Sequence, residues 1–305
     1  MCGLFGFSRL NDKTRDMARF LAYAMVFRGD DSWGASNGVE VIKELGPITD
    51  GFHIPPKWRE GIFHTRGASV GAVTQKNAHP FVVEHDGRRI IGIHNGGVRN
   101  WEEMNRRYDR HCEVDSEHLF YHLAERKNLG ELIGVGTIIW YDIYNGQQTI
   151  HLARWNFGDL AIARLKGENG IVFCSTKDPI QLAASIAGLE IDTFYQPITD
   201  GFWHVIEQGK KGDDVLAKGQ SLGFDNYRFI DRRSSNYDHW RQTAASHSAL
   251  NNCRRCHTAP AGKQIMCVDC WKVLRINHDS EEAVKDRKKP QGDYVGRVPQ
   301  FGLVN

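Results

Sequence analysis

Cys2 is the residue whose position most clearly suggests chemistry, because it directly follows Met1. If an aminopeptidase removes Met1, Cys2 carries a free α-amino group beside its thiol. An α-amino group has an unperturbed pKa of about 7.7 to 8.0, so near neutral pH it can take the thiol proton and later pass it to a leaving group. One residue would then supply both a nucleophile and a base.

Four of the other cysteines have the spacing of metal ligands. They form two Cys-x2-Cys pairs: Cys253, Cys256, Cys267 and Cys270. Four thiolates suit the tetrahedral coordination of Zn²⁺, and a site closed by four protein ligands has no position for a catalytic water. The pattern predicts a structural zinc knuckle, with redox-active cysteine pairs as the alternative and His257 as a possible substitute ligand. The isolated Cys112 and Cys174 are predicted to be buried small side chains.

Five short polar motifs follow Cys2 in the first part of the chain. They are Arg28-Gly29-Asp30-Asp31-Ser32, His64-Thr65-Arg66, Asn77-Ala78-His79-Pro80, His94-Asn95-Gly96 and Asp115-Ser116-Glu117. Any one of them alone is typical of a turn or a loop. Their order along one chain is what makes them informative.

Together with Cys2-Gly3-Leu4-Phe5-Gly6, this ordered set resembles the glutaminase domain of class II glutamine amidotransferases, which are N-terminal nucleophile enzymes. In particular it resembles the glutaminase half of glucosamine-6-phosphate synthase, and the resemblance covers residues 2–207. It implies an α+β fold, a four-layer αββα sandwich of the N-terminal nucleophile hydrolase type with two antiparallel sheets between helices. It also implies hydrolysis of L-glutamine to L-glutamate and ammonia through a thioester on Cys2, with no cofactor for this reaction.

The resemblance also implies roles for the catalytic residues. The Asn95 side chain and the Gly96 N–H would form an oxyanion hole for the charge that develops on the amide oxygen. Such a donor contributes about 2.7–4 kcal/mol in other hydrolases. Arg28 would orient the chain around Cys2, and a purely structural role in its loop is an equal alternative.

A second group of residues would bind the substrate. By resemblance, Arg66 would bind the α-carboxylate of glutamine through its planar guanidinium, and Asp115 would bind the α-ammonium. Together they would select a free amino acid over a peptide side chain. Gly96, Ser69 and His79, which belong to the same motifs, complete the predicted substrate site.

The loop after Arg66 departs from the family pattern. Gly67 stands where family members typically have an aromatic residue, and residues 68–71 (Ala-Ser-Val-Gly) stand where the glucosamine branch has Ala-Thr-His-Gly. The serine keeps a hydroxyl, but the valine cannot donate a hydrogen bond. Because this loop covers glutamine in the relatives, we expect changes in lid closure and glutamine affinity and an unchanged catalytic core.

A synthase domain that would consume the ammonia is not recognisable in the sequence. Only about a hundred residues follow residue 207, and they contain neither a phosphate-binding glycine loop nor an ATP signature. This predicts a glutaminase subunit that delivers ammonia to a separate synthase partner. Docking would use the basic C-terminal region, where residues 226–305 carry 14 Lys and Arg against 8 Asp and Glu.

Two other classes of function stay open. One is an N-terminal nucleophile hydrolase of a different amide, which the altered 67–70 loop permits and Arg66 and Asp115 argue against. The other is a zinc-knuckle protein that binds nucleic acid or protein and whose glutaminase fold is a relic or regulatory. Aromatic residues among its arginines could stack on bases, although core packing is the commoner explanation. A nucleotide or nucleic-acid base as the ammonia acceptor would combine these features.

Regular elements must position these motifs. Hydrophobic residues at helical spacing behind Asn11 predict a helix from about Lys13 to Val26. Asn100 and Glu103 have the spacing of a capping box and predict a helix that buries Met104 with its aromatic neighbours Trp101 and Tyr108. A third helix is expected to begin at Asp115 or Ser116 with Leu119, Phe120 and Leu123 facing inward, and a fourth at Asp178 with Pro179 in its first position. Strands are predicted at residues 89–94, 136–143, 148–153, 160–165, 170–175 and 201–207.

The polar, glycine-containing stretch 208–214 predicts that the glutaminase domain ends at residue 207. An irregular linker is expected at 208–250, the zinc knuckle with a zinc-ribbon-like fold at 251–278, and a mobile tail at 279–305. The 305-residue chain has a formal net charge of +2. No apolar run approaches the roughly 18 residues that would span a membrane, and no signal peptide is recognisable, so a cytoplasmic protein without membrane association is expected.

Overall fold

The computed structural model describes residues 2–48, 52–156, 158–197, 200–206, 212–219 and 222. Two compact units divide the chain, one comprising Met1–Ile48 with His53–Asn226 and the other Thr49–Phe52 with Tyr227–Asn305. The helices and strands reported below all belong to the first unit. The predicted linker, zinc knuckle and tail lie almost entirely outside the described residues.

Sheet A contains seven antiparallel strands in the order β11-β9-β10-β1-β4-β2-β3. The strands are β1 (Gly3–Phe7), β2 (Ser32–Ser36), β3 (Val41–Leu45), β4 (Gly61–Arg66), β9 (Ala161–Leu165), β10 (Ile171–Cys174) and β11 (Ile191–Tyr195). Every residue of β1 and β4 is buried. Both faces of the sheet centre must therefore be covered, and the start of β1 lies beside the end of β4 because Gly3 pairs with Thr65.

Sheet B contains six strands in the order β13-β12-β8-β7-β6-β5. The strands are β5 (Phe81–His85), β6 (Arg88–Val98), β7 (Gly134–Tyr144), β8 (Gln147–Trp155), β12 (Gly201–Ile206) and β13 (Val215–Lys218). The long β6 and β7 pair without interruption over eleven residues each. This continuous pairing gives the end of β6, which carries the His94-Asn95-Gly96 motif, a rigid support.

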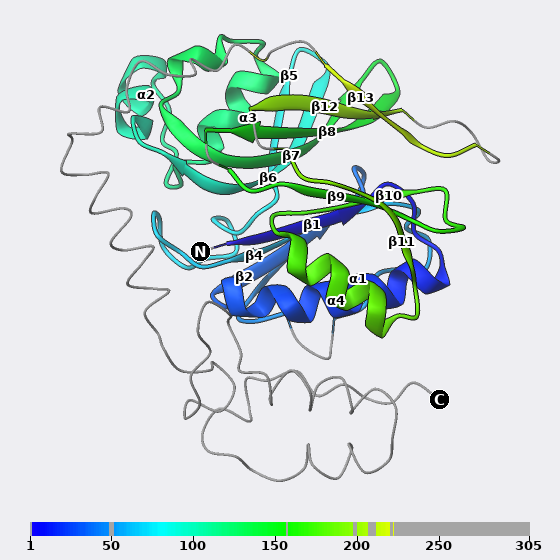
Figure 1. Ribbon diagram of the computed structural model, residues 1–305. Coiled ribbons are helices and arrows are strands. Elements are labelled where there is room, and N and C mark those ends of the chain that lie inside the picture. The colour runs from blue at the N-terminus through cyan, green and yellow to red at the C-terminus, as the bar shows by residue number, and fades with distance from the viewer. Residues whose placement is uncertain are drawn as a thin grey trace, which may run out of the picture. The chain divides into compact units, whose positions relative to one another are not determined.

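Helices cover the outer face of each sheet, which produces four layers (Figure 1). The helices α1 (Asp12–Met25) and α4 (Lys177–Ile186) pack against sheet A, and α3 (Glu117–Ala124) packs against β5 and β6 of sheet B. The shorter α2 (Trp101–Tyr108) lies on the same side as α3, and single 3₁₀ turns occur at Val26–Arg28 and Leu129–Glu131. The α+β, αββα arrangement expected for residues 2–207 is therefore present.

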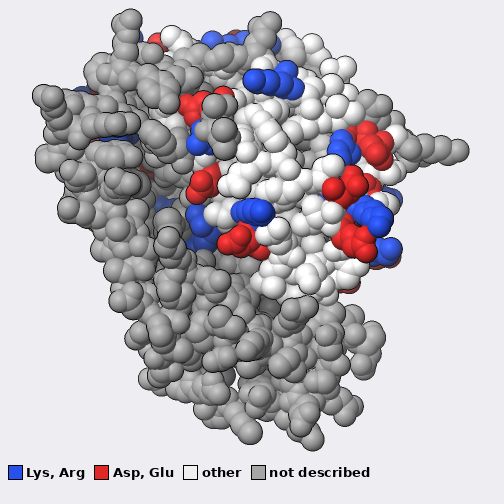
Figure 2. Space-filling view, in the orientation of Figure 1, with Lys and Arg blue, Asp and Glu red and all other residues white. Residues whose placement is uncertain are grey.

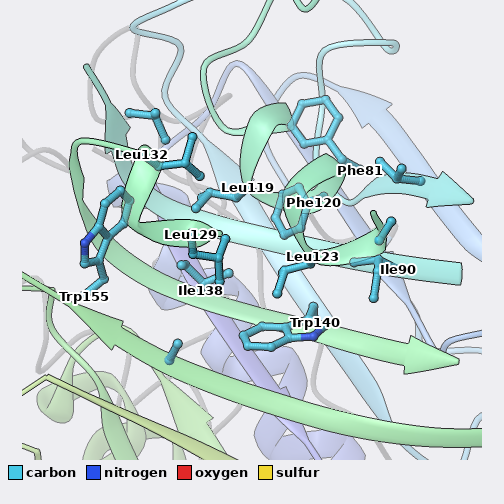
Figure 3. Packing of buried hydrophobic residues seen from close by; sticks show 14 of the residues in the cluster. Phe81, Ile90, Leu119, Phe120, Leu123, Leu129, Leu132, Ile138, Trp140 and Trp155 are labelled. Atoms are coloured by element: carbon cyan, nitrogen blue, oxygen red, sulfur yellow. The ribbon is translucent and has the colours of Figure 1, made fainter. Parts of the chain in front are cut away.

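Hydrophobic cores fill the space between the two sheets and the space between sheet B and its helices. The core between the sheets contains Leu4, Ile62 and Phe173 from sheet A and Ile93 and Ile139 from sheet B, all fully buried or nearly so. The second core lies between sheet B and its helices and is shown in Figure 3, where the side chains of α3 face Ile138 and Trp140. Its inward residues include Leu119, Phe120 and Leu123, as the sequence pattern predicts.

The local signals were right at some helix ends and wrong at others. Asn11 accepts a hydrogen bond from the N–H of Thr14 and completes a capping box, so the first helix begins close to its predicted start. The box predicted at Asn100 is wrong, because the Asn100 side chain instead bonds to the carbonyl of Glu131 and the N–H of Ile133. Of the three predicted core residues of α2, only Met104 is buried.

The chain continues to add to sheet B after the boundary predicted at residue 207. The strand β13 pairs antiparallel with β12, with Ile206 opposite Val215. The stretch 208–214 therefore separates two strands of one sheet and does not end the domain. Pro179 occupies the third residue of α4 and not the first, which is tolerated because the first four N–H groups of a helix have no partner within it.

No helix in the described part of the chain is both long and apolar enough to cross a membrane. On the face drawn in Figure 2, acidic and basic side chains of the described residues lie close to one another.

Candidate active site

Cys2 directly precedes β1 and is half-buried. Its thiol lies 3.6 Å from the carbonyl oxygen of Gly67, the residue that follows β4. The pairing of Gly3 with Thr65 brings the start of β1 and the end of β4 together, although they are more than sixty positions apart in the sequence. The thiol therefore lies beside the loop that follows Arg66.

Arg28 holds the peptide that follows Cys2. Its Nε donates a hydrogen bond of 2.9 Å to the carbonyl oxygen of Cys2. Burial lowers the pKa of Arg28, and nearby Cys174 and Asp159 oppose this effect. This bond holds the Arg28 side chain against the backbone of Cys2, and the orienting role stays a prediction.

Burial raises the pKa of the Cys2 thiol, while the positive charges of Arg66 and Arg28 act in the opposite direction. Because the net direction is upward, the thiol is protonated near neutral pH in this environment. A nucleophile of this kind needs a base in direct contact with it.

His64 and His94 connect the two sheets at this end of the sandwich. His64 Nε2 lies 3.0 Å from the carbonyl oxygen of His94, so β4 is joined to β6 one residue before Asn95. A carbonyl can only accept a hydrogen bond, so His64 Nε2 carries the hydrogen. Burial lowers the pKa of His64 to about 3, and the ring is neutral at ordinary pH.

The His94 side chain holds the end of β6 in place through two hydrogen bonds. Its Nε2 lies 3.2 Å from the carbonyl oxygen of Val135 and its Nδ1 lies 2.9 Å from the hydroxyl oxygen of Ser116. Nε2 must donate to the carbonyl, so Nδ1 accepts from the Ser116 hydroxyl. Burial lowers the pKa of His94 to about 4, which keeps this tautomer neutral.

Asn95 and Gly96 occupy consecutive positions of β6 opposite Thr137 and Gly136 of β7. Asn95 is half-buried and Gly96 is exposed. A Cβ atom on Gly96 would lie 1.9 Å from the Val135 carbonyl oxygen, so only glycine fits at this position. The backbone that carries the predicted oxyanion donors is therefore in close contact with the backbone of β7.

Arg66 is 2% exposed and its guanidinium bonds to the following loop. Its Nη2 donates to the carbonyls of Val70 at 2.6 Å and Gly71 at 3.2 Å, and its Nη1 donates to that of Ala72 at 3.2 Å. A guanidinium can bind a carboxylate through two parallel N–H groups, either those of Nη1 and Nη2 or those of Nε and Nη2. Both pairs therefore include Nη2. Bidentate binding of a carboxylate therefore requires Arg66 to release Val70 or Gly71.

Asp115 lies just before α3 and is 7% exposed. Its Oδ2 accepts a 2.6 Å hydrogen bond from the N–H of Val98, at the end of β6. Burial raises the pKa of Asp115, and the positive charge of Arg66 opposes this shift. Arg66 and Asp115 are thus close enough to interact electrostatically, yet no direct ion pair joins them within the described ranges.

The two other predicted substrate-binding residues are placed differently. Ser69 is exposed, and no hydrogen bond of its side chain is found in the described part of the chain. His79 is buried, and its ring lies 4.0 Å from that of His64, centroid to centroid. Burial lowers the pKa of His79 well below its ordinary value. His79 therefore packs in the interior behind the site.

Sequence reasoning missed Asp31. Its Oδ2 accepts a 2.7 Å hydrogen bond from the N–H of Ala68, and its own N–H donates to the Arg66 carbonyl. Gly29 contacts the same backbone, since a Cβ there would lie 2.3 Å from the carbonyl carbon of Arg66. Asp31 belongs to the Arg28 motif. A carboxylate at this place in the motif was the sequence signal that could have indicated its role.

Cys112 and Cys174 are free and buried, as predicted. No cluster of three or more metal-ligating side chains is found among the described residues. The four predicted zinc ligands lie outside that part of the chain.

Part of this chain is similar in sequence to known proteins. Residues 54–129 match the family model described as class-II glutamine amidotransferases. The glutamine–fructose-6-phosphate aminotransferase of Thermus thermophilus is 36% identical over 149 residues, which are 44% of this chain and 24% of that protein. The enzyme of the same name from Geobacillus kaustophilus is 36% identical over 115 residues, which are 35% of this chain and 19% of that protein. The matched region thus spans less than a quarter of the length of these relatives.

Solved structures with a similar fold extend the comparison. Glutamine phosphoribosylpyrophosphate amidotransferase from B. subtilis superposes with a TM-score of 0.52 and 17% identity, over 72% of this chain and 50% of that one. An allosteric regulatory enzyme of purine biosynthesis superposes with a TM-score of 0.54 over the same shares. At this identity the likeness concerns the fold, which agrees with the sequence match. The chain therefore contains a region of the class II glutamine amidotransferase type, which is a type found in enzymes.

Proposed function

We propose that this domain hydrolyses L-glutamine to L-glutamate and ammonia, with Cys2 as the nucleophile. The observation that carries the proposal is the position of the Cys2 thiol beside Gly67, which follows Arg66 directly. The nucleophile thus lies beside the residue that follows Arg66, whose side chain is proposed to bind the substrate carboxylate. The family match of residues 54–129 supports the same substrate class.

The proposed reaction begins after removal of Met1. The α-amino group of Cys2 takes the thiol proton as sulfur attacks the amide carbon of glutamine, because the raised pKa of the thiol leaves little preformed thiolate. The Asn95 side chain and the Gly96 N–H stabilise the oxyanion. The amine then protonates the departing nitrogen, ammonia leaves, and water hydrolyses the thioester to glutamate.

Substrate selection follows from two charged side chains. Arg66 binds the α-carboxylate of glutamine, and the ionised Asp115 binds its α-ammonium. Both side chains are buried, so their charges act in a medium that screens them weakly. An acyl group on the α-nitrogen of glutamine removes the positive charge and is expected to abolish efficient turnover.

Two assays on one preparation test this proposal. Intact mass spectrometry establishes whether Met1 is removed, and glutamate release is measured for wild type and Cys2→Ala with glutamine and N-acetylglutamine as substrates. We expect Met1 to be absent, Cys2→Ala to be inactive, and N-acetylglutamine to be a poor substrate. Retention of Met1 in active protein, or equal activity of the two proteins, would refute the mechanism.

The fate of the ammonia is a further part of the proposal. A separate synthase partner receives it, and a nucleotide or nucleic-acid base is the proposed acceptor, with nucleic acid contacting the basic residues 226–305. Affinity capture of the full chain tests for the partner. Constitutive full-rate hydrolysis without any captured protein would contradict this part.

We also propose that a structural Zn²⁺ is bound by the four cysteines of the two Cys-x2-Cys pairs, Cys253, Cys256, Cys267 and Cys270. The support is their spacing and their thiol chemistry. Such a reduced site is typical of the cytoplasm, where we place the protein. Metal analysis should find one Zn²⁺ per chain in wild type and none after Cys253→Ser with Cys267→Ser, and equal metal content would rule the site out.

A further inference from the structure

The loop between β4 and β5 contains a buried amide that joins two parts of the candidate site. Asn77 is fully buried. Its Nδ2 donates to the carbonyl oxygen of Ala72 at 3.1 Å and to Oε2 of Glu113 at 3.0 Å. Neither acceptor belongs to the residues proposed to touch glutamine.

Each acceptor is tied to one of the two charged side chains of the site. The carbonyl of Ala72 also accepts from Arg66 Nη1. Glu113 begins the turn that carries Asp115, and this turn is fixed because the N–H groups of Glu113 and Val114 both donate to Oε1 of Glu117. A continuous series of bonds thus runs from Arg66 through Asn77 to the segment of Asp115.

The same two segments are in close backbone contact. Gly71 has a φ of +78°, and a Cβ atom there would lie 2.7 Å from the carbonyl oxygen of Glu113. The loop and the turn therefore approach as closely as glycine allows. This contact limits closer approach, and the Asn77 bonds prevent separation.

The bond from Asn77 to Glu113 is charge-assisted. Lys76 lies 2.7 Å from the Glu113 carboxylate, and hydrogen bonds from Lys76 and Asn77 lower the pKa of Glu113. The carboxylate is therefore ionised near neutral pH, and hydrogen bonds to ionised acceptors are stronger than neutral ones. The exposed ion pair with Lys76 contributes little by itself.

We propose that Asn77 and Glu113 are positioning residues that set the separation between Arg66 and Asp115. The inference rests on the proposed function, in which these two side chains bind the carboxylate and ammonium ends of glutamine. A fixed separation suits glutamine, which carries both charges on one carbon atom. Loss of the bond loosens substrate binding and leaves the chemistry at Cys2 intact.

Three substitutions at exposed positions isolate this bond. Glu113→Ala removes the acceptor for Asn77 and the ion pair with Lys76, Lys76→Ala removes only the ion pair, and Glu113→Gln keeps a carbonyl acceptor for Asn77. We expect KM for glutamine to rise about tenfold in Glu113→Ala, the size associated with one charge-assisted bond, with kcat within about threefold of wild type. Lys76→Ala and Glu113→Gln should stay within about twofold of wild type in KM.

A labelling experiment separates recognition from reactivity. Iodoacetamide alkylates a thiol without needing an α-carboxylate or α-ammonium, whereas 6-diazo-5-oxo-L-norleucine carries both groups. Glu113→Ala should slow labelling of Cys2 by the diazoketone about tenfold and leave alkylation by iodoacetamide unchanged. Asn77→Ala should do the same, with its folding checked by thermal unfolding.

The outcomes distinguish this inference from the proposed function. If wild type hydrolyses glutamine but Glu113→Ala behaves like Lys76→Ala, only the positioning role is refuted. The same holds if Glu113→Ala lowers kcat and both labelling rates together, which would indicate general disruption. If wild type neither hydrolyses glutamine nor reacts with the diazoketone, both proposals are refuted.

Discussion

The substitution Gly96→Ala tests the predicted oxyanion hole most directly. The added Cβ would lie 1.9 Å from the Val135 carbonyl oxygen and 2.5 Å from Nε2 of His94. Contacts below 3.0 Å do not occur for real Cβ atoms, so the strand must shift by about 1 Å or more. Neither neighbour can yield easily, because Val135 pairs with Gly97 within the β6–β7 ladder and the His94 ring is bonded on both sides.

The shift displaces the Gly96 N–H from the position where it would meet the developing oxyanion. Loss of one such donor lowers kcat by about 10²–10³-fold, or about 2.7–4 kcal/mol of transition-state stabilisation. The steric strain itself destabilises the fold by about 1–3 kcal/mol. We therefore expect a large fall in kcat, a much smaller change in KM and a lower Tm.

Gly146→Ala is the matched control, because it destabilises the fold without touching the site. Gly146 has a φ of +74° and open space where a Cβ would lie, so alanine there introduces only backbone strain, at a cost of about 1 kcal/mol. Steady-state glutamate release and thermal unfolding are measured for both variants. If folded Gly96→Ala keeps kcat within about threefold of wild type, or loses no more activity than Gly146→Ala, the assignment of Gly96 is wrong.

Three further predictions concern binding, pH and metal. Arg66→Lys replaces the planar fork by a single ammonium, so KM for glutamine should rise at least about tenfold, and an unchanged KM would show that Arg66 only holds the loop. Because burial raises the pKa of Asp115, the carboxylate that binds the α-ammonium is lost at a higher pH than for an ordinary aspartate. KM should therefore rise as pH falls through this raised pKa, and Asp115→Asn should have a high KM at every pH; a wild-type KM that does not change with pH would contradict the assignment. Chelation of zinc should unfold the C-terminal module while glutamine hydrolysis persists, and loss of both together would show that the metal also supports the glutaminase domain.

Sequence reasoning located most elements because their signals are local. The helix α1 follows from the Asn11 cap and the spacing of Met17 and Leu21, which are both buried. The Asn100 cap failed because a tertiary contact offered its side chain other partners, the backbone groups of Glu131 and Ile133. A local sequence pattern cannot show that such tertiary partners compete with the helix N-terminus for the Asn100 side chain.

The boundary at residue 207 failed for a related reason. A polar glycine-containing stretch has the same composition whether it ends a domain or separates two strands, and only pairing of β13 with β12 distinguishes the two. Within the site, the sequence motifs indicated Cys2 and Arg28, whose bond the structure contains. They also contain Asp31, but its role was not predicted, because its partner Ala68 is 37 positions away along the chain.

The sequence by itself determined which chemical groups this domain possesses: a thiol next to Met1, a guanidinium and a carboxylate in ordered motifs, and glycine at the end of β6. Tertiary structure decided the protonation state of these groups and the spacing between them. Burial raises the pKa of the Cys2 thiol, and burial lowers the pKa of His94, which keeps its ring neutral. The series of bonds through Asn77 links Arg66 to the Asp115 segment. Desolvation and distance depend on neighbours that are remote in sequence, so they arise only when the chain is folded.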